Sequence, residues 1–222
     1  MKLHNPYSFV IFDWDGTIMD STDRIVNAMR KSAKNIGLTI PSESDVKGII
    51  GLSMQACMDR LFPQADEEER AALLEEYRFQ YVEGDNTPTP LFEGVIESLE
   101  WLKSHDILIA VATGKSRVGL ERVLREVDLL NYFHSSICAD EAAGKPHPEM
   151  VQRLMEGAGF KPLQTLVVGD SVHDLHMAKN AGVDAIGVTS GANQHHELDP
   201  LSPIAIFENV VELKPWLETR HS

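Results

Sequence analysis

The stretch Phe9-Val-Ile-Phe-Asp-Trp-Asp-Gly-Thr17 decides how the rest of the chain is interpreted. Four apolar residues followed by two carboxylates predict a buried strand that ends in a polar turn. Side chains at i and i+2 leave an extended chain on the same side, so Asp13 and Asp15 can face one pocket. Two carboxylates that close repel each other unless a cation lies between them. The pair alone fits a magnesium site or an ordinary capped strand end.

The composition is that of a soluble globular protein, with 43% apolar and 24% charged residues in a chain of 222. A formal net charge of −14 argues against a nucleic-acid partner, because such proteins need clustered Lys and Arg. No segment is long and apolar enough to span a membrane, and residues 1–6 lack the apolar core of a signal peptide. We therefore expect no membrane partner and a cytoplasmic location. No pattern indicates an oligomeric state.

The two cysteines, Cys57 and Cys138, lie far apart and have no second thiol nearby. This spacing predicts neither a disulfide framework nor a cysteine-rich zinc site. We expect both side chains to be small apolar packing residues.

The interval between Asp13 and the next apolar run, Ile107-Leu-Ile-Ala-Val-Ala112, is far longer than one βαβ crossover requires. Helical patterns fill this interval, followed by a linker at 85–90. The helical segments are 22–37, one that starts near Pro41, 54–62, and 66 to about 83. The sequence therefore predicts an α/β core of residues 1–17 and 89–222 with an inserted helical subdomain of residues 18–88.

Beyond residue 93 the patterns of strands and helices alternate, which predicts a doubly wound parallel sheet with helices on both faces. The predicted strands are 107–112, 136–139, 165–168, 185–188 and 204–207. The predicted helices are 94–104, 116–127, 148–158, 172–181 and 210–217.

Polar residues follow three of these strands, and ligands of open parallel sheets bind beyond the carboxyl ends of the strands. Thr113-Gly-Lys115 follows the second strand and Gly169-Asp-Ser-Val-His-Asp174 the fourth, while Gly144-Lys-Pro-His-Pro148 adds a lysine between them. We expect these groups to meet Asp13 and Asp15 at one site.

The expected charge of this site identifies its chemistry. Asp13, Asp170 and Asp174 contribute three negative charges, with Asp15 a fourth candidate. Lys145 offsets one charge and a magnesium ion two, which leaves a site that tolerates a phosphoryl dianion.

Phosphate oxygens have further candidate partners at this site. These are the Thr113 hydroxyl and the backbone amides around Gly114 and Gly16. Phosphoryl transfer depends mostly on positioning and charge neutralisation of this kind.

With these four motifs in this order, the chain resembles the haloacid dehalogenase superfamily, in its phosphatase branch with a helical cap inserted after the first strand. The resemblance implies that Asp13 is the nucleophile and forms an aspartyl-phosphate, while Asp15 acts as acid and then as base. It implies that Thr113 binds the phosphate and that Lys145 steadies nucleophile and phosphate. Mg²⁺ is then held by Asp13, Asp170 and the Asp15 carbonyl.

Several assignments have a structural alternative. Asp174 fits the second acid of the last motif and would orient metal-bound water, yet it also has capping-box spacing from Ser171. Thr113 can be a turn former and Lys145 a solvated loop residue. His173 and His176 have a spacing that permits metal binding, but we expect them on a solvated helix face.

The acid at position 15 points to phosphate esters, because the dehalogenase branch has no acid there. The resemblance implies a phosphatase for a small phosphorylated metabolite, similar to phosphoglycolate phosphatase. A sugar phosphomutase of the same superfamily is the alternative enzyme, and a catalytically silent binding protein is the non-enzymatic one. The loop Lys47-Gly-Ile-Ile-Gly-Leu-Ser53 is the candidate for substrate selection, although its glycines can also simply separate two helices.

Overall fold

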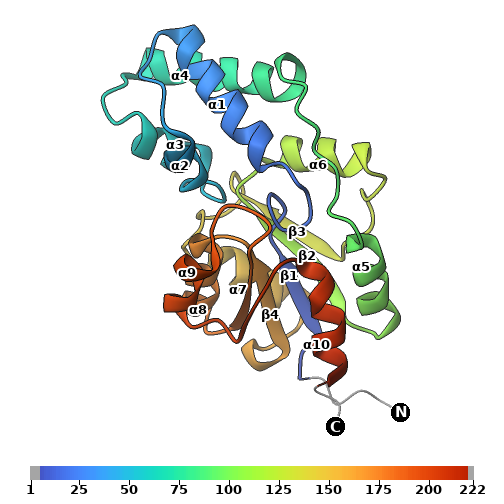
Figure 1. Ribbon diagram of the computed structural model, residues 1–222. Helices are drawn as coiled ribbons and strands as arrows, with labels where there is room; N and C mark the ends of the chain where they lie inside the picture. The colour runs from blue at the N-terminus through green and yellow to red at the C-terminus, as the bar shows by residue number, and fades with distance from the viewer. Residues whose placement is uncertain (1–5, 220–222) are drawn as a thin grey trace.

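The computed structural model, which describes residues 6–219, is built around a six-stranded parallel sheet (Figure 1). The strand order is β3-β2-β1-β4-β5-β6, so the first strand of the chain lies inside the sheet. The strands are β1 (Phe9–Phe12), β2 (Leu108–Thr113), β3 (Ser135–Cys138), β4 (Thr165–Gly169), β5 (Asp184–Val188) and β6 (Ala205–Phe207). The predicted doubly wound α/β fold is confirmed.

Both faces of the sheet are buried, because alternate residues of each strand enter different apolar clusters. In β1, Val10 and Phe12 join one cluster while Phe9 and Ile11 join the other. The first cluster is completed by α5 (Val95–Ser104), α6 (Arg117–Glu126) and α10 (Leu213–Thr219), and the second by α7 (Glu149–Ala158) and α8 (Val172–Ala181). The short elements are η2 (Pro162–Gln164), α9 (His195–Leu198), η3 (Asp199–Leu201) and η4 (Val210–Glu212).

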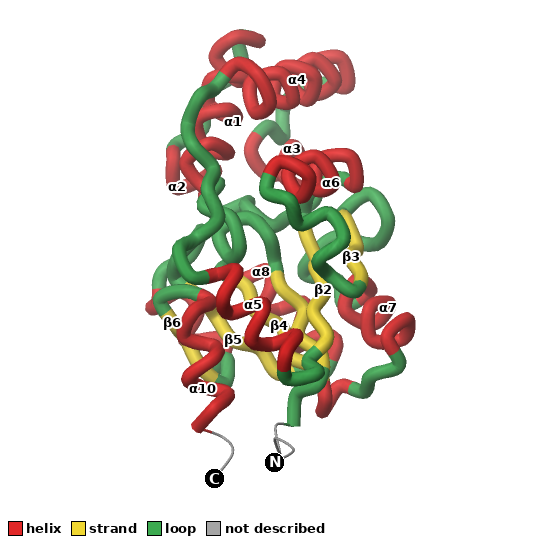
Figure 2. The backbone as a smooth tube through the Cα atoms, turned by 90° about the vertical axis from the view of Figure 1, so that its right-hand side faces the viewer, coloured by secondary structure: helices red, strands yellow, loops and turns green. Residues whose placement is uncertain are grey.

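A group of helices between β1 and α5 has an apolar cluster of its own. These elements are α1 (Thr22–Ile36), α2 (Glu43–Lys47), α3 (Met54–Leu61), α4 (Glu67–Phe79) and the π-helical turn η1 (Gln80–Gly84). Figures 1 and 2 show them together beyond the end of the sheet at which β1 leads into α1. The division of the chain into a core and a helical subdomain of residues 18–88 stays a prediction. Residues 1–5 and 220–222 of the predicted core lie outside the described range.

Most predicted elements lie within two residues of their observed bounds, with two differences. The helix expected over residues 66 to 83 changes after Phe79 into the wider turn η1, in which the Asp85 amide donates to the Gln80 carbonyl. The helix expected over 210–217 is a 3₁₀ turn followed by α10. Among the described residues, no helix has the length and apolar character needed to cross a bilayer. Residues 1–5, at which the sequence predicts no signal peptide, lie outside the described range.

Leu73 of α4 is fully buried in the helical group, so it offers a direct test of this packing. We expect Leu73→Ala to lower the free energy of unfolding by about 2–5 kcal/mol in urea denaturation, because the lost side chain leaves a cavity. The matched change Leu163→Ala, at a side chain that is 85% exposed, should cost less than about 0.5 kcal/mol. Equal losses for the two variants would contradict the observed packing of α4.

Candidate active site

The pairing register of the central strands brings the predicted motifs to one edge of the sheet. Phe12 pairs with both Val111 of β2 and Val168 of β4, so the three strands end at nearly the same level. The Asp13 amide still donates to the Val168 carbonyl, at 2.9 Å. The segments that follow Phe12, Val111 and Val168 therefore leave the sheet side by side, as the sequence predicts.

Lys145 joins two of the predicted acids in a fully buried cluster. Its Nζ lies 2.8 Å from Asp13 Oδ1 and 2.6 Å from Asp174 Oδ1, and all three side chains are at most 2% exposed. The alternative of a solvated loop lysine is therefore wrong. Asp13 Oδ1 also accepts a hydrogen bond from the Trp14 amide, whereas Oδ2 has no hydrogen-bond partner in the described part of the chain.

The acids of this site outnumber its buried lysine. Burial raises the pKa of Asp13 well above its usual range, with a further rise from Asp174 that Lys145 only partly opposes. Burial and then Asp174 raise the pKa of Asp170 to about 7. Burial alone would lower the pKa of Lys145, but Asp13 and Asp174 raise it above its ordinary value, so the lysine is a fixed cation. The remaining negative charge favours a bound cation.

Asp13, Asp170 and Asp174 each present an oxygen within 4.8 Å of the others, and all three are buried. Carboxylate oxygens are the ligands that Mg²⁺ prefers, and the unpartnered Asp13 Oδ2 leaves one of them available. The residues present therefore fit a magnesium ion.

Asp170 is held in place by backbone that only glycine allows to come so close. Its Oδ1 accepts from the Thr17 hydroxyl at 2.9 Å, and its Oδ2 accepts from the Ala192 amide at 2.7 Å. A Cβ atom on Gly16, which has φ +77°, would lie 2.3 Å from Asp170 Oδ2, and one on Gly191 only 2.0 Å. Gly16 therefore contributes by admitting this carboxylate.

Asp174 caps a helix and also contacts a residue of the predicted active site. It forms the predicted capping box with Ser171, whose amide and hydroxyl donate to Asp174 Oδ2. Its other oxygen pairs with Lys145, so the residue is more than a helix cap. A role beside metal-bound water stays a prediction.

Asp15 follows Asp13 in the same turn and has partners of its own. Ser21 donates to Asp15 Oδ1 at 2.5 Å, and Lys115 Nζ lies 3.0 Å from the same oxygen. Lys115 also donates to the Tyr81 hydroxyl, at 3.1 Å, which links Asp15 to the helical group. Burial alone would lower the pKa of Lys115, but Asp15 and Tyr81 raise it above its usual value.

Thr113 and Gly114 lie where β2 ends, against the loop 47–53. Thr113 is fully buried, and its hydroxyl accepts from the Lys115 amide at 3.2 Å. A Cβ atom on Gly114 would lie 2.6 Å from the Leu52 carbonyl oxygen. The same loop comes close to the acids, because a Cβ atom on Gly51 would lie 3.9 Å from Asp13 Oδ2.

The expectation of a solvated face for both histidines of α8 is wrong for His173. This side chain is only 8% exposed, because the 47–53 loop covers it and its Nε2 lies 3.1 Å from the Gly48 carbonyl oxygen. Burial lowers the pKa of His173, which favours a neutral ring that donates to this carbonyl. His176 is exposed, and neither histidine joins a metal-ligating group among the described residues.

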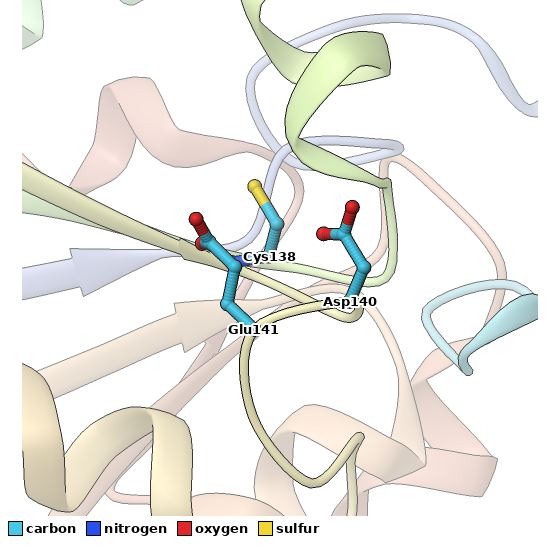
Figure 3. A group of neighbouring side chains, drawn as sticks. All are labelled: Cys138, Asp140 and Glu141. Atoms are coloured by element: carbon cyan, nitrogen blue, oxygen red, sulfur yellow. The ribbon is translucent and has the colours of Figure 1, made fainter.

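A second acidic group lies on the loop after β3, where Cys138, Asp140 and Glu141 have their ligand atoms close together (Figure 3). Both carboxylates already have a common partner, because the Arg117 amide donates to Asp140 and its guanidinium to Glu141. This group therefore connects the loop to the start of α6. Cys57 and Cys138 are both buried and free, as the sequence predicts.

Comparison with known proteins agrees with this geometry. The family model for haloacid dehalogenase-like hydrolases matches residues 10–188, and the chain belongs to this family of enzymes. The resemblance inferred from the four motifs is thereby confirmed.

Individual relatives match over nearly the whole chain. A protein named probable phosphatase IndB from Dickeya dadantii (strain 3937) is 34% identical over 208 residues, 92% of this chain and 90% of that protein. A phosphoglycolate phosphatase from Agrobacterium fabrum is 30% identical over 93% of this chain and 91% of its own length. A crystal structure of a predicted phosphoglycolate phosphatase from Haemophilus somnus has a TM-score of 0.84 at 26% identity and covers 96% of this chain and 99% of that one.

Removal of one carboxylate from each acidic group should show which of the two groups binds Mg²⁺. We expect Asp170→Asn to weaken Mg²⁺ binding at least about tenfold in isothermal titration calorimetry, because the buried oxygen set loses a charge. Asp140→Asn makes the same chemical change in the group held by Arg117 and should leave the affinity unchanged. If only Asp140→Asn weakened Mg²⁺ binding, the metal site would be the group of Cys138, Asp140 and Glu141 instead.

Proposed function

We propose that this protein is a magnesium-dependent phosphatase that hydrolyses a phosphorylated metabolite through an aspartyl-phosphate on Asp13. The proposal rests on the buried contact of Asp13 and Asp174 with Lys145, next to Asp170, and on Asp13 Oδ2, which accepts no hydrogen bond from residues 6–219. The relatives reported above are named phosphatases, which favours hydrolysis over the phosphomutase alternative.

In the first step a carboxylate oxygen of Asp13 forms a bond to phosphorus while the bond from phosphorus to the leaving oxygen breaks. Asp15 gives its proton to the leaving oxygen. The hydrogen bond from Ser21 and the contact with Lys115 Nζ, both made to Oδ1, fix the position of the Asp15 carboxyl group two residues after the nucleophile. Both groups come from a single turn, so their relative position is set by the backbone of residues 13–15.

In the second step Asp15, now a carboxylate, takes a proton from water, and the water oxygen attacks the aspartyl-phosphate. The bond between phosphorus and the Asp13 oxygen breaks, which releases inorganic phosphate and restores the free enzyme. Charge neutralisation during both steps comes from Lys145, whose ammonium group is already in contact with Asp13.

The phosphate itself is held by groups that surround this turn. We assign the Thr113 hydroxyl and the amides near Gly114 and Gly16 to the phosphate oxygens. When bound, Mg²⁺ supplies two further positive charges next to the phosphoryl group. Asp13, Asp170 and the Asp15 carbonyl would hold it, with Asp174 acting through water.

The helical segment 18–88 then serves as a cap that shields the reaction from bulk water. Its loop 47–53 lies against both Gly114 and Asp13, which supports a role in substrate selection. The relatives' names make a phosphoglycolate-like substrate one candidate within this class of small phosphorylated metabolites.

We expect Asp13→Asn to abolish phosphate release from p-nitrophenyl phosphate, because the amide is a poor nucleophile. The far-ultraviolet circular dichroism spectrum should be unchanged, since the substitution is isosteric. Asp23→Asn, at an exposed acid of α1, is the matched control and should retain full activity. Substantial turnover by Asp13→Asn would rule out the covalent mechanism.

Asp15→Asn should slow hydrolysis by about 10²–10⁴-fold, the usual contribution of a general acid–base group. The loss should be smaller for release of p-nitrophenol than for an alkyl alcohol, because a good leaving group needs less protonation. Steady-state phosphate release with both esters gives this comparison, and Asp20→Asn, at an exposed acid, is the control. If the hydrolysis rates of the two esters fell equally, Asp15 would not be the general acid.

A further inference from the structure

A cavity of about 550 Å³ opens beside Asp15, the residue to which we assign protonation of the leaving group. Its walls come from the helical group, from the 47–53 loop and from the start of α6. Figures 1 and 2 show α6 on the side of the sheet nearest to the helical group. On the helical side the wall includes Ile25, Met29, Ile49 and Tyr77.

Apolar side chains form most of this wall, and its inner charges are already paired. Asp15 and Lys115 bind each other, so neither is left without a partner inside the cavity. Of the other charged residues at the wall, Arg122 pairs with Glu126 and Asp140 accepts from the Arg117 amide, while Arg78 is exposed to solvent. The cavity therefore offers a substrate far more apolar surface than charge.

The opening of the cavity is apolar as well. Val82 of η1 and Val118 of α6 both line the cavity, one from the helical group and one from the core. Val82 is 46% exposed and Val118 is 78% exposed, so both present apolar surface to solvent. The Tyr77 hydroxyl has no hydrogen bond within residues 6–219 that are described, although the ring lines the same cavity.

We propose that this cavity is a leaving-group site for phosphomonoesters with an apolar organic body, longer than the two-carbon glycolate. The inference rests on the proposed phosphatase function and names the substrate class within it. A volume of about 550 Å³ lies in the range of pockets that enclose a whole organic ligand. Glycolate has almost no apolar surface to bury there, whereas an alkyl or aryl group would displace water from these walls.

The test is a series of n-alkyl phosphates from ethyl through butyl and hexyl to octyl, with phosphoglycolate for comparison. The leaving alcohols of this series have nearly the same acidity, so only the length of the apolar body changes. We expect kcat/KM to rise about threefold to fourfold per methylene until the cavity is filled, which corresponds to burial of each added group. A flat or falling series, with phosphoglycolate as the best substrate, would overturn the inference.

A second measurement does not depend on turnover. Alkyl phosphonates of the same chain lengths carry no cleavable ester, so calorimetric titration reports binding alone. Octyl phosphonate should bind at least about tenfold more tightly than ethyl phosphonate, because its added methylenes reach the apolar walls. Equal affinities would contradict the inference even if the protein hydrolyses phosphate esters.

The proposed function and this inference fail in different ways. Failure to hydrolyse the activated ester p-nitrophenyl phosphate would overturn the phosphatase proposal and with it this inference. Hydrolysis of that ester that depends on Asp13, combined with no dependence on chain length in rate or binding, would overturn only the apolar leaving-group site.

Variants at the opening locate the effect. Val118→Trp and Val82→Trp should reduce the gain per methylene for hexyl and octyl phosphates. Leu163→Trp makes a comparable change at a side chain that is 85% exposed and does not line the cavity, and it should preserve the whole series. Identical chain-length dependence in all variants would place the apolar contact elsewhere.

Discussion

Lys145 Nζ lies 2.8 Å from Asp13 Oδ1 and 2.6 Å from Asp174 Oδ1, in a site closed to solvent. Attraction between opposite charges is strong where little water screens it, but the same burial makes each unpaired charge costly. One lysine stands against the three clustered acids Asp13, Asp170 and Asp174. Burial first, and then the neighbouring carboxylate of Asp174, raises the pKa of Asp13, and the excess of negative charge suits the site to a dication.

The sheet determines where this imbalance arises. β1 is flanked by β2 and β4, so the segments carrying Thr113 and Asp170 leave the sheet next to the turn of Asp13 and Asp15. The helical group then closes the remaining side through the 47–53 loop and through the contact of Tyr81 with Lys115. In the function that we propose, the sheet edge carries out the phosphoryl chemistry and the helical group selects the leaving group.

Much of the fold could be predicted because strands covered on both faces are nearly continuous apolar runs, as in residues 107–112. The meeting of Asp13, Lys145 and Asp174 followed from the rule that polar residues gather beyond strand ends. Contacts made by side-chain reach between elements were not predictable in this way. Lys115 belonged to a recognised motif, yet nothing in its spacing indicates that it pairs with Asp15.

Three further features have no local sequence signal. Ser21 donates to Asp15 across an irregular turn, and no periodic pattern marks that position. His173 is buried by a loop 125 positions away in the chain, so the helix that carries it gives no sign of the cover. Position 191 also requires glycine for a reason that its neighbours in sequence do not show, because Asp170 comes too close for a Cβ atom.

The most direct test of the account is a crystal structure of the protein with Mg²⁺ and beryllium trifluoride, an analogue of a phosphoryl group on a carboxylate. We expect the analogue on the Asp13 carboxylate, in contact with Lys145 and Thr113, and the metal ion between Asp13 and Asp170. An analogue or metal ion bound at another carboxylate, with Asp13 unmodified, would contradict it.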